Sequence, residues 1–302
     1  MAQPSKELIF KTLNTTQHRV SEDANLFSSE INHADYWFYT DLYNLFSHPM
    51  FDPENMYEHT YQKFDTAPAQ ANKIAPYEFF KSHTILYNHK YTINSPHPPY
   101  NPITKNGTDI KLSRYACYCL FRNAPGLIFT RTYFMMPDAD FKTLYETSYR
   151  FARIYQRQKL RETERTLSGI LKKLDVNIAL FHHETTRTFF GEYTIDDIRN
   201  AYSLPTSTPI ADNMGAISLH ARRHAIDTAV KKFDYAHTRD FRSFSMILHN
   251  ELRIARNKMI SEYKFPPEKD IHKTSIKSIE SEYKKLEQQF IKTYAAQNLQ
   301  SK

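Results

Sequence analysis

The residues most suited to chemistry in this sequence are the cluster His182-His183-Glu184 and the acidic pair Asp196-Asp197. Imidazole and carboxylate groups are common ligands of divalent metals. Adjacent histidines on a regular helix point in different directions, however, and the H-E-x-x-H spacing that would place two of them on one face is absent. Asp197 follows Thr194 by three residues, which is the spacing of a helix capping box, and acids favour helix N-termini. We therefore expect no metal site.

The sequence also lacks the common motifs for nucleotide binding and nucleophilic catalysis. Only five of the 302 residues are glycine, and neither G-x-x-x-x-G-K-[ST] nor G-x-G-x-x-G occurs. The nucleophile elbow G-x-S-x-G is absent as well. Cys117 and Cys119 lie in an apolar run, and a helix would point them in different directions, so we expect two buried thiols. These features predict a protein that is not an enzyme and needs no cofactor.

Basic residues are the remaining candidates for a functional site. The formal net charge is +7, and residues 138–173 hold nine Lys/Arg against five Asp/Glu, whereas residues 1–137 hold twelve of each. Residues 212–264 hold ten basic against six acidic residues. A basic helical face is typical of phosphate binding, although many basic helices are simply solvated. We predict that the residues in contact with nucleic acid are Arg114, Arg150, Arg153, Arg157, Arg161, Arg165, Arg222, Arg223, Lys231 and Lys232. For Arg114, a structural ion pair with a nearby acid is an equal alternative.

Hydrophobic patterning predicts short strands and helices in the first part of the chain. Residues 36–39 read as a buried strand followed by a short helix. Residues 51–110 are rich in Pro, Asn, His and Tyr, which favours short strands and turns. Ser113 is a predicted cap for a helix over residues 114–122, and residues 129–136 are apolar and β-prone.

Long helices are predicted after Pro137. Asp138 is expected to cap one long helix, or two in line, that reaches Leu174 and carries an apolar face and an arginine face. Thr208-Pro209 has the pattern of a cap followed by a proline at the first helical position. The further helices expected are those over residues 176–193, 194–202, 208 onward, 240–263 and 274–290.

The last of these helices has apolar residues at heptad spacing, namely Ile276, Ile279, Tyr283, Leu286 and Phe290. This spacing fits dimerisation and fits equally a helix that packs on its own domain. The elements together predict the α+β fold class in four parts. These are an N-terminal extension (1–34), a small α+β domain (35–137), a mainly helical domain (138–264) and a C-terminal helix that could set oligomerisation (265–302).

Several segments resemble, in the same order, motifs of the DNA-damage-inducible protein D family. The segment at 112–120 is similar to the family's L-S-R-Y-A-C-Y motif, and Thr132-Tyr133-Phe134 resembles the next motif. The later matches are residues 179–183, 211–219, 250–253, 267–268 and 275–277. Residues 36–133 also resemble the BRO-type N-terminal domain of viral and phage proteins. This resemblance implies a BRO-like α+β domain followed by a helical region.

The resemblance further implies a role in the SOS response to DNA damage, in which the protein modulates the recombinase filament and strand exchange without catalysis. The expected partners are single-stranded or duplex DNA, the recombinase filament and a second copy of the chain. Because no long apolar span occurs, we expect a soluble protein in the cytoplasm, associated with the nucleoid. The alternatives are a phage-derived regulator that binds duplex DNA through residues 35–137, a metal-dependent nuclease, and an oligomeric scaffold.

Overall fold

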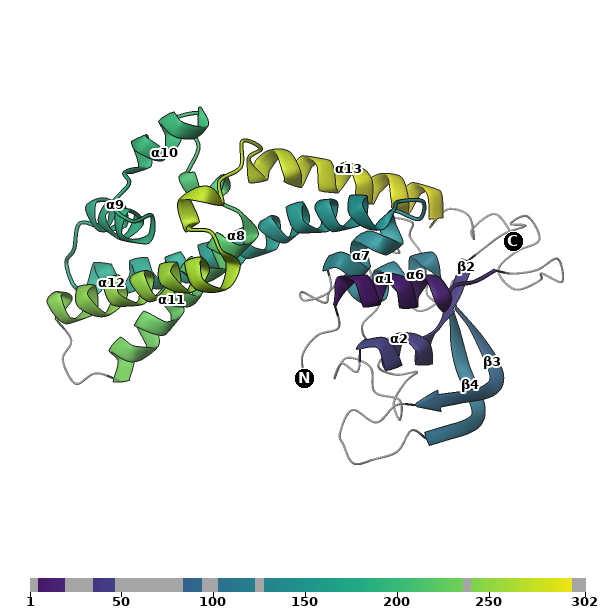
Figure 1. Cartoon of the computed structure of the whole chain (residues 1–302). Coiled ribbons are helices and arrows are strands. Elements are labelled where there is room, and N and C mark those ends of the chain that lie inside the picture. Colours follow the sequence, from purple (N-terminus) through teal and green to yellow (C-terminus); the bar gives the residue numbers. More distant parts are fainter. Residues whose placement is uncertain are drawn as a thin grey trace. The chain divides into compact units, whose positions relative to one another are not determined.

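The computed structural model describes residues 5–19, 35–46, 84–93, 103–122, 128–235 and 240–294. Within these ranges the fold is mainly helical with one small antiparallel sheet, which agrees with the predicted fold class at this coarse level (Figure 1). The chain divides into two compact units. The first comprises residues 1–148 and 284–302, and the second comprises residues 149–283.

The first unit contains a four-stranded antiparallel sheet in the order β1-β2-β4-β3. Its strands β3 and β4 form a ribbon that pairs from Thr84 opposite Leu112 to Ile93 opposite Ile103. The strand predicted at residues 36–39 is confirmed as β2, whereas the ribbon is longer than the short strands that we expected. The strands are β1 (His18–Arg19), β2 (Asp35–Phe38), β3 (Thr84–Ile93) and β4 (Ile103–Ser113).

Four helices of the first unit are α1 (Lys6–Thr15), α2 (Tyr39–Phe46), α6 (Arg114–Arg122) and α7 (Ile128–Met135). The predicted cap of α6 is confirmed, because the Ser113 hydroxyl accepts a hydrogen bond from the backbone N–H of Ala116 at 3.1 Å. The β-prone segment at 129–136 is instead helix α7. Its aromatic residues are buried, and Phe134 stacks on Phe121 at 5.6 Å, so tertiary packing overrides the β propensity.

Helix α1 belongs to the first unit, which corrects the prediction of a separate N-terminal extension. Ile9 and Leu13 are buried on one face of the helix. The indole N–H of Trp37 donates a hydrogen bond to the carbonyl oxygen of Leu13 at 3.0 Å. The described residues 5–19 are therefore packed on β2 rather than lying outside the fold. The rest of the predicted extension lies outside the described residues.

The second unit is helical. Its apolar core gathers side chains from α8 to α12, and α11 lies beside α12 (Figure 1). Helix α8 begins in the first unit and α13 ends in it. The second unit therefore starts at residue 149 rather than at the predicted 138, and residues 265–302 do not form a separate part. The helices are α8 (Phe141–Lys173), α9 (Ile178–Phe189), α10 (Ile195–Tyr202), α11 (Ala216–Tyr235), α12 (Phe241–Lys258) and α13 (Ile276–Tyr294), with short turns η1 (Ile210–Asp212), η2 (Met259–Tyr263) and η3 (Pro267–Lys269).

Helix ends in the second unit follow local side-chain chemistry. The predicted Thr194–Asp197 capping box is present on α10. The helix predicted from residue 240 is α12, and Asp240 is its N-cap. Two predicted starts are wrong. Helix α8 starts after Asp140, whose carboxylate accepts from the Thr143 N–H at 2.7 Å. Helix α11 starts only at residue 216, because residues 210–212 form η1 and Met214 pairs with Ile271 in an isolated β-bridge.

The apolar face of α13 packs within the chain. Ile276 and Ile279 are buried, and the Tyr283 ring meets Phe151 with centroids 4.9 Å apart. Phe290 is buried against Tyr118 in the first unit. Of the two alternatives for the heptad spacing, the structure therefore supports packing on the same chain. None of the described helices has the combined length and apolar character that a membrane crossing requires.

Candidate functional site

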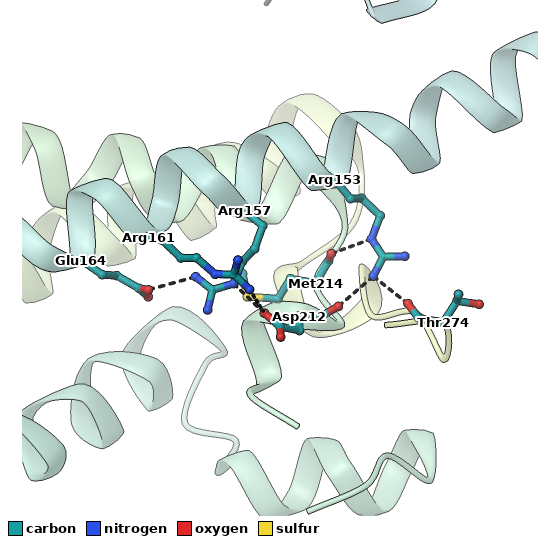
Figure 2. A network of polar contacts seen from close by, with 7 residues as sticks. All are labelled: Arg153, Arg157, Arg161, Glu164, Asp212, Met214 and Thr274. Atoms are coloured by element: carbon teal, nitrogen blue, oxygen red, sulfur yellow. Dashed lines mark hydrogen bonds and ion pairs between the residues drawn. The ribbon is translucent and has the colours of Figure 1, made fainter. Parts of the chain in front are cut away.

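Arg153, which we predicted to contact nucleic acid, points into the protein (Figure 2). Its side chain is only 1% exposed. The Nε–H donates to the carbonyl of Met214 at 3.0 Å, and Nη2 donates to the carbonyls of Asp212 at 3.2 Å and Thr274 at 3.0 Å. Burial lowers the pKa of Arg153 to about 10, so the guanidinium remains charged at neutral pH. Arg153 therefore connects α8 to two other backbone segments, residues 212–214 and Thr274, and its prediction as a phosphate contact is wrong.

The next arginines along α8 surround a buried carboxylate (Figure 2). Asp212 is 1% exposed and accepts from Nε of Arg157 at 2.7 Å, while Nη2 of Arg161 lies 3.5 Å from the same oxygen. Arg157 also pairs with Glu164 at 3.0 Å. Removing a charge from water costs several kcal/mol, and this arrangement offsets that cost with paired charges. The donors of Arg157 are thus engaged by two carboxylates.

A cleft of about 690 Å³ lies beside this network, between α8, α9, α10, α11 and the segment at 209–211. Arg161, Arg165 and Lys172 are four and seven residues apart, so they share one face of α8. Among the lining side chains one is acidic, Glu164, and six are basic, namely Arg157, Arg161, Arg165, Lys172, Arg199 and Arg222. A hollow lined by one sign of charge concentrates ligands of the opposite sign. The cleft is therefore a candidate site for anions.

Arg222 is the unusual member of this set. It is 4% exposed, and Nη2 donates to the Thr186 hydroxyl at 3.1 Å. Its Nε has no hydrogen-bond partner, and no carboxylate lies within ion-pair distance of it in the described part of the chain. Burial lowers the pKa of Arg222, Glu164 acts in the opposite direction, and Arg157 lowers it further. The fold thus keeps a guanidinium inside, at the wall of the cleft, with a neutral hydroxyl as its only partner among the described residues.

His182 also lines the cleft. Burial lowers its pKa, and Arg222 lowers it further, whereas Glu164 raises it, so the ring is neutral at pH 7. His183 is exposed and does not line the cleft. Within the described ranges, no three His, Cys, Asp or Glu side chains are grouped so that they could hold a metal ion.

Other predicted contacts lie outside the cleft. Arg114 is 4% exposed, pairs with Asp35 at 3.1 Å and lies 4.9 Å from the Trp37 ring, so the structural alternative is correct for it. The remaining four predicted residues do not line the cleft. Three of them have acidic partners, namely Arg150 with Glu282, Arg223 with Asp227 and Lys232 with Glu251. The fourth, Lys231, is exposed. The structure brings together Arg157, Arg161, Arg165 and Arg222 from the predicted set.

Among the basic and imidazole side chains of the cleft, the sequence-based prediction missed Lys172, Arg199 and His182. Lys172 lies seven residues after Arg165, and this helical spacing could have identified it. Arg199 lies in an acidic stretch of sequence, and His182 was considered only as a metal ligand. His182 lies on α9, the helix that follows α8 in the chain, and Arg199 lies on α10. The helical spacing within α8 does not predict residues of other helices, so only tertiary packing brings these two to the cleft.

No protein-family model matches the chain, and no curated protein or solved structure shows significant similarity to it. The chemistry of the cleft is therefore the basis on which a function can be assigned.

Proposed function

We propose that the protein binds DNA without catalysing a reaction on it, and that the basic cleft provides the phosphate contacts. The observation that carries the proposal is the charge of the cleft, with six basic side chains against one carboxylate. Positively charged grooves of this kind follow the sugar–phosphate backbone of nucleic acids. The proposal of a binding role rather than an enzymatic one rests on the absence of catalytic motifs from the sequence.

A role in the DNA-damage response, exerted on recombination complexes, rests on the resemblance to the DNA-damage-inducible protein D family. A protein that binds the DNA on which a recombinase filament forms can modulate that filament. A site that recognises phosphates would bind such DNA whatever its sequence. The cytoplasmic, nucleoid-associated location is part of the same proposal.

The composition of the cleft favours phosphate contacts over base contacts. Its apolar lining is aliphatic, formed by Ile195, Pro209, Ile210 and Ala211, and the imidazole of His182 is the one aromatic ring among its lining residues. The cleft therefore offers little surface for the stacking of bases on aromatic rings. Contacts with phosphates alone position a protein on DNA without reading its sequence. We accordingly expect binding that depends strongly on salt and weakly on sequence.

The salt dependence provides the test. Arg165 and Lys172 are exposed and have no acidic partner among the described residues. Arg165→Gln together with Lys172→Gln should lower the slope of log K against log salt by about 1.4 for single-stranded DNA, since each lost contact removes about 0.7. Fluorescence anisotropy with a labelled oligonucleotide, between about 50 and 200 mM salt, measures this slope.

The matched control is Arg242→Gln with Arg253→Gln. These arginines are exposed on α12 and do not line the cleft, and the change in net charge is the same. Equal slopes for the two double variants would show that the cleft is not the contact surface. A wild-type protein that neither binds DNA at low salt nor alters strand exchange by a recombinase would contradict the proposal as a whole.

A second candidate is binding of duplex DNA through the first unit, as the BRO-type resemblance implies. The β3–β4 ribbon favours it, because a two-stranded ribbon fits the major groove. The ribbon sequence contains Lys90, Lys105 and Lys111 against one acid, Asp109. In the full chain, Lys105→Gln with Lys111→Gln should then weaken duplex binding while the cleft variant leaves it unchanged. The reverse result would exclude this candidate.

A further inference from the structure

We propose that the inner wall of the cleft, formed by Arg222, Thr186 and His182, binds a phosphomonoester dianion. This group occurs at the end of a DNA strand and on a free nucleotide, and both present the same chemistry. The inference rests on the proposed function, because it assigns part of the same cleft to the terminal phosphate rather than to phosphates within the strand.

The charges of the cleft favour a doubly charged ligand. Three basic side chains of the cleft have acidic partners: Arg157, Arg161 and Arg199, the last paired with Asp196 at 3.4 Å. The other three are Arg165, Lys172 and Arg222, and none of them has a carboxylate partner in the described part of the chain. A singly charged ligand would leave most of this excess in place, whereas a dianion would neutralise more of it.

The guanidinium of Arg222 is buried with most of its donors free. A guanidinium has five N–H donors, and in the described chain only the one to Thr186 is engaged. Buried arginines normally have carboxylate or phosphate partners, because the desolvation of an uncompensated charge is unfavourable. Arg222 borders the cleft, so a ligand that enters can provide the acceptor that the protein does not.

A terminal phosphate differs from an internal phosphate in its charge and in its number of free oxygens. A phosphomonoester has three free oxygens, and most of it carries a second charge at pH 7 because its second pKa is about 6. An internal phosphodiester has two free oxygens, one charge, and a nucleoside on each side. Because Arg165 and Lys172 are exposed while Arg222 is inside, the strand interior fits the exposed pair and the terminal group fits Arg222.

His182 supplies an independent readout. Arg222 and Glu164 are the charged groups that act on its ring, and its pKa is lowered by burial and by Arg222 in the absence of a ligand. A dianion bound beside the ring would stabilise the imidazolium form. The pKa of His182, followed by NMR with His182→Gln as the assignment control, should therefore rise when inorganic phosphate is added.

The experiment compares oligonucleotides of one sequence that carry a 5′-phosphate, a 3′-phosphate or only hydroxyl ends, with the full chain in phosphate-free buffer. We expect about tenfold tighter binding of a phosphorylated end, the effect of one strong charge-assisted hydrogen bond. Inorganic phosphate in excess should raise the thermal midpoint by about 3 °C. If a nucleoside monophosphate at low concentration abolishes the preference for phosphorylated ends, the free nucleotide is the better ligand. If the preference remains, the phosphorylated strand end is the better ligand.

Arg222→Met separates a binding role from a structural one. Loss of an uncompensated buried charge should leave the midpoint without phosphate unchanged or higher, while the end preference and the phosphate response disappear. Arg223→Met is the control, because Arg223 pairs with Asp227 and does not line the cleft. If Arg222→Met does not fold, His182→Gln should still reduce the end preference.

Equal binding of phosphorylated and hydroxyl ends by the wild type, with no response to inorganic phosphate, would overturn this assignment. Binding of the hydroxyl-ended strand would persist in that case, so the proposed DNA-binding function would stand. Absence of binding to every oligonucleotide would instead contradict the proposed function itself.

Discussion

Replacement of Arg153 by methionine should lower the free energy of unfolding of the second unit by about 3–5 kcal/mol. Arg153 donates to the carbonyls of Asp212, Met214 and Thr274, and the side chain is buried. Methionine fills a similar volume but donates no hydrogen bond. Buried carbonyl groups would then remain without their partner. Urea denaturation followed by circular dichroism at helical wavelengths measures the loss.

The direction of this effect follows from the nature of the acceptors. Apolar residues can replace a buried ion pair at little cost when both partners are replaced together. The acceptors of Arg153 are backbone carbonyls, however, and substitution cannot remove them. Arg242→Met, at an exposed position of α12, is the matched control and should change stability by less than about 0.5 kcal/mol. Equal stability of the two variants would show that the Arg153 contacts do not hold the unit together.

Local signals in the sequence predicted most of the helices. The Thr194–Asp197 box, the Asp240 cap and the Ser113 cap each depend on residues within three positions of one another, so the sequence alone can identify them. The start of α11 could not be predicted in this way. Thr208-Pro209 has the local pattern of a helix start, but a β-bridge from Met214 to Ile271 delays the helix, and its partner lies far away in the sequence.

The arginine face of α8 shows the same limit for the site. The predicted arginines from 150 to 165 recur at helical spacing, and this spacing places them near one another on the helix. It does not distinguish a solvated face from a buried one. Arg153 and Arg157 are inside because Asp212, more than fifty residues away in the chain, provides acceptors for both. The isolated position of Arg222 inside the protein likewise has no signature in its sequence neighbourhood.

Substitution of alanine for Gly215 and for Gly169, both in the second unit, should change the free energy of unfolding in opposite directions. At Gly215 a Cβ atom would lie 1.9 Å from Oδ1 of Asp270, too close for any contact. The carboxylate of Asp270 would have to move, although its Oδ2 accepts from the N–H of Ser218 at 3.0 Å and from its hydroxyl at 2.8 Å. Overpacking costs about 1–3 kcal/mol and loss of a helix cap about 1 kcal/mol, so Gly215→Ala should destabilise the unit by about 2–4 kcal/mol.

Gly169 lies near the end of α8, and a Cβ there would meet no atom within 4 Å. Alanine is favoured over glycine inside a helix by about 0.5–1 kcal/mol, so Gly169→Ala should stabilise the protein by that amount. Urea denaturation of both variants gives the two signs, and hydrogen exchange should show reduced protection at the start of α11 in Gly215→Ala alone. Equal effects of the two substitutions would mean that the backbone at Gly215 can move away from Asp270 without loss. In that case the hydrogen bonds that Ser218 donates to the Asp270 carboxylate would not be what fixes the start of α11.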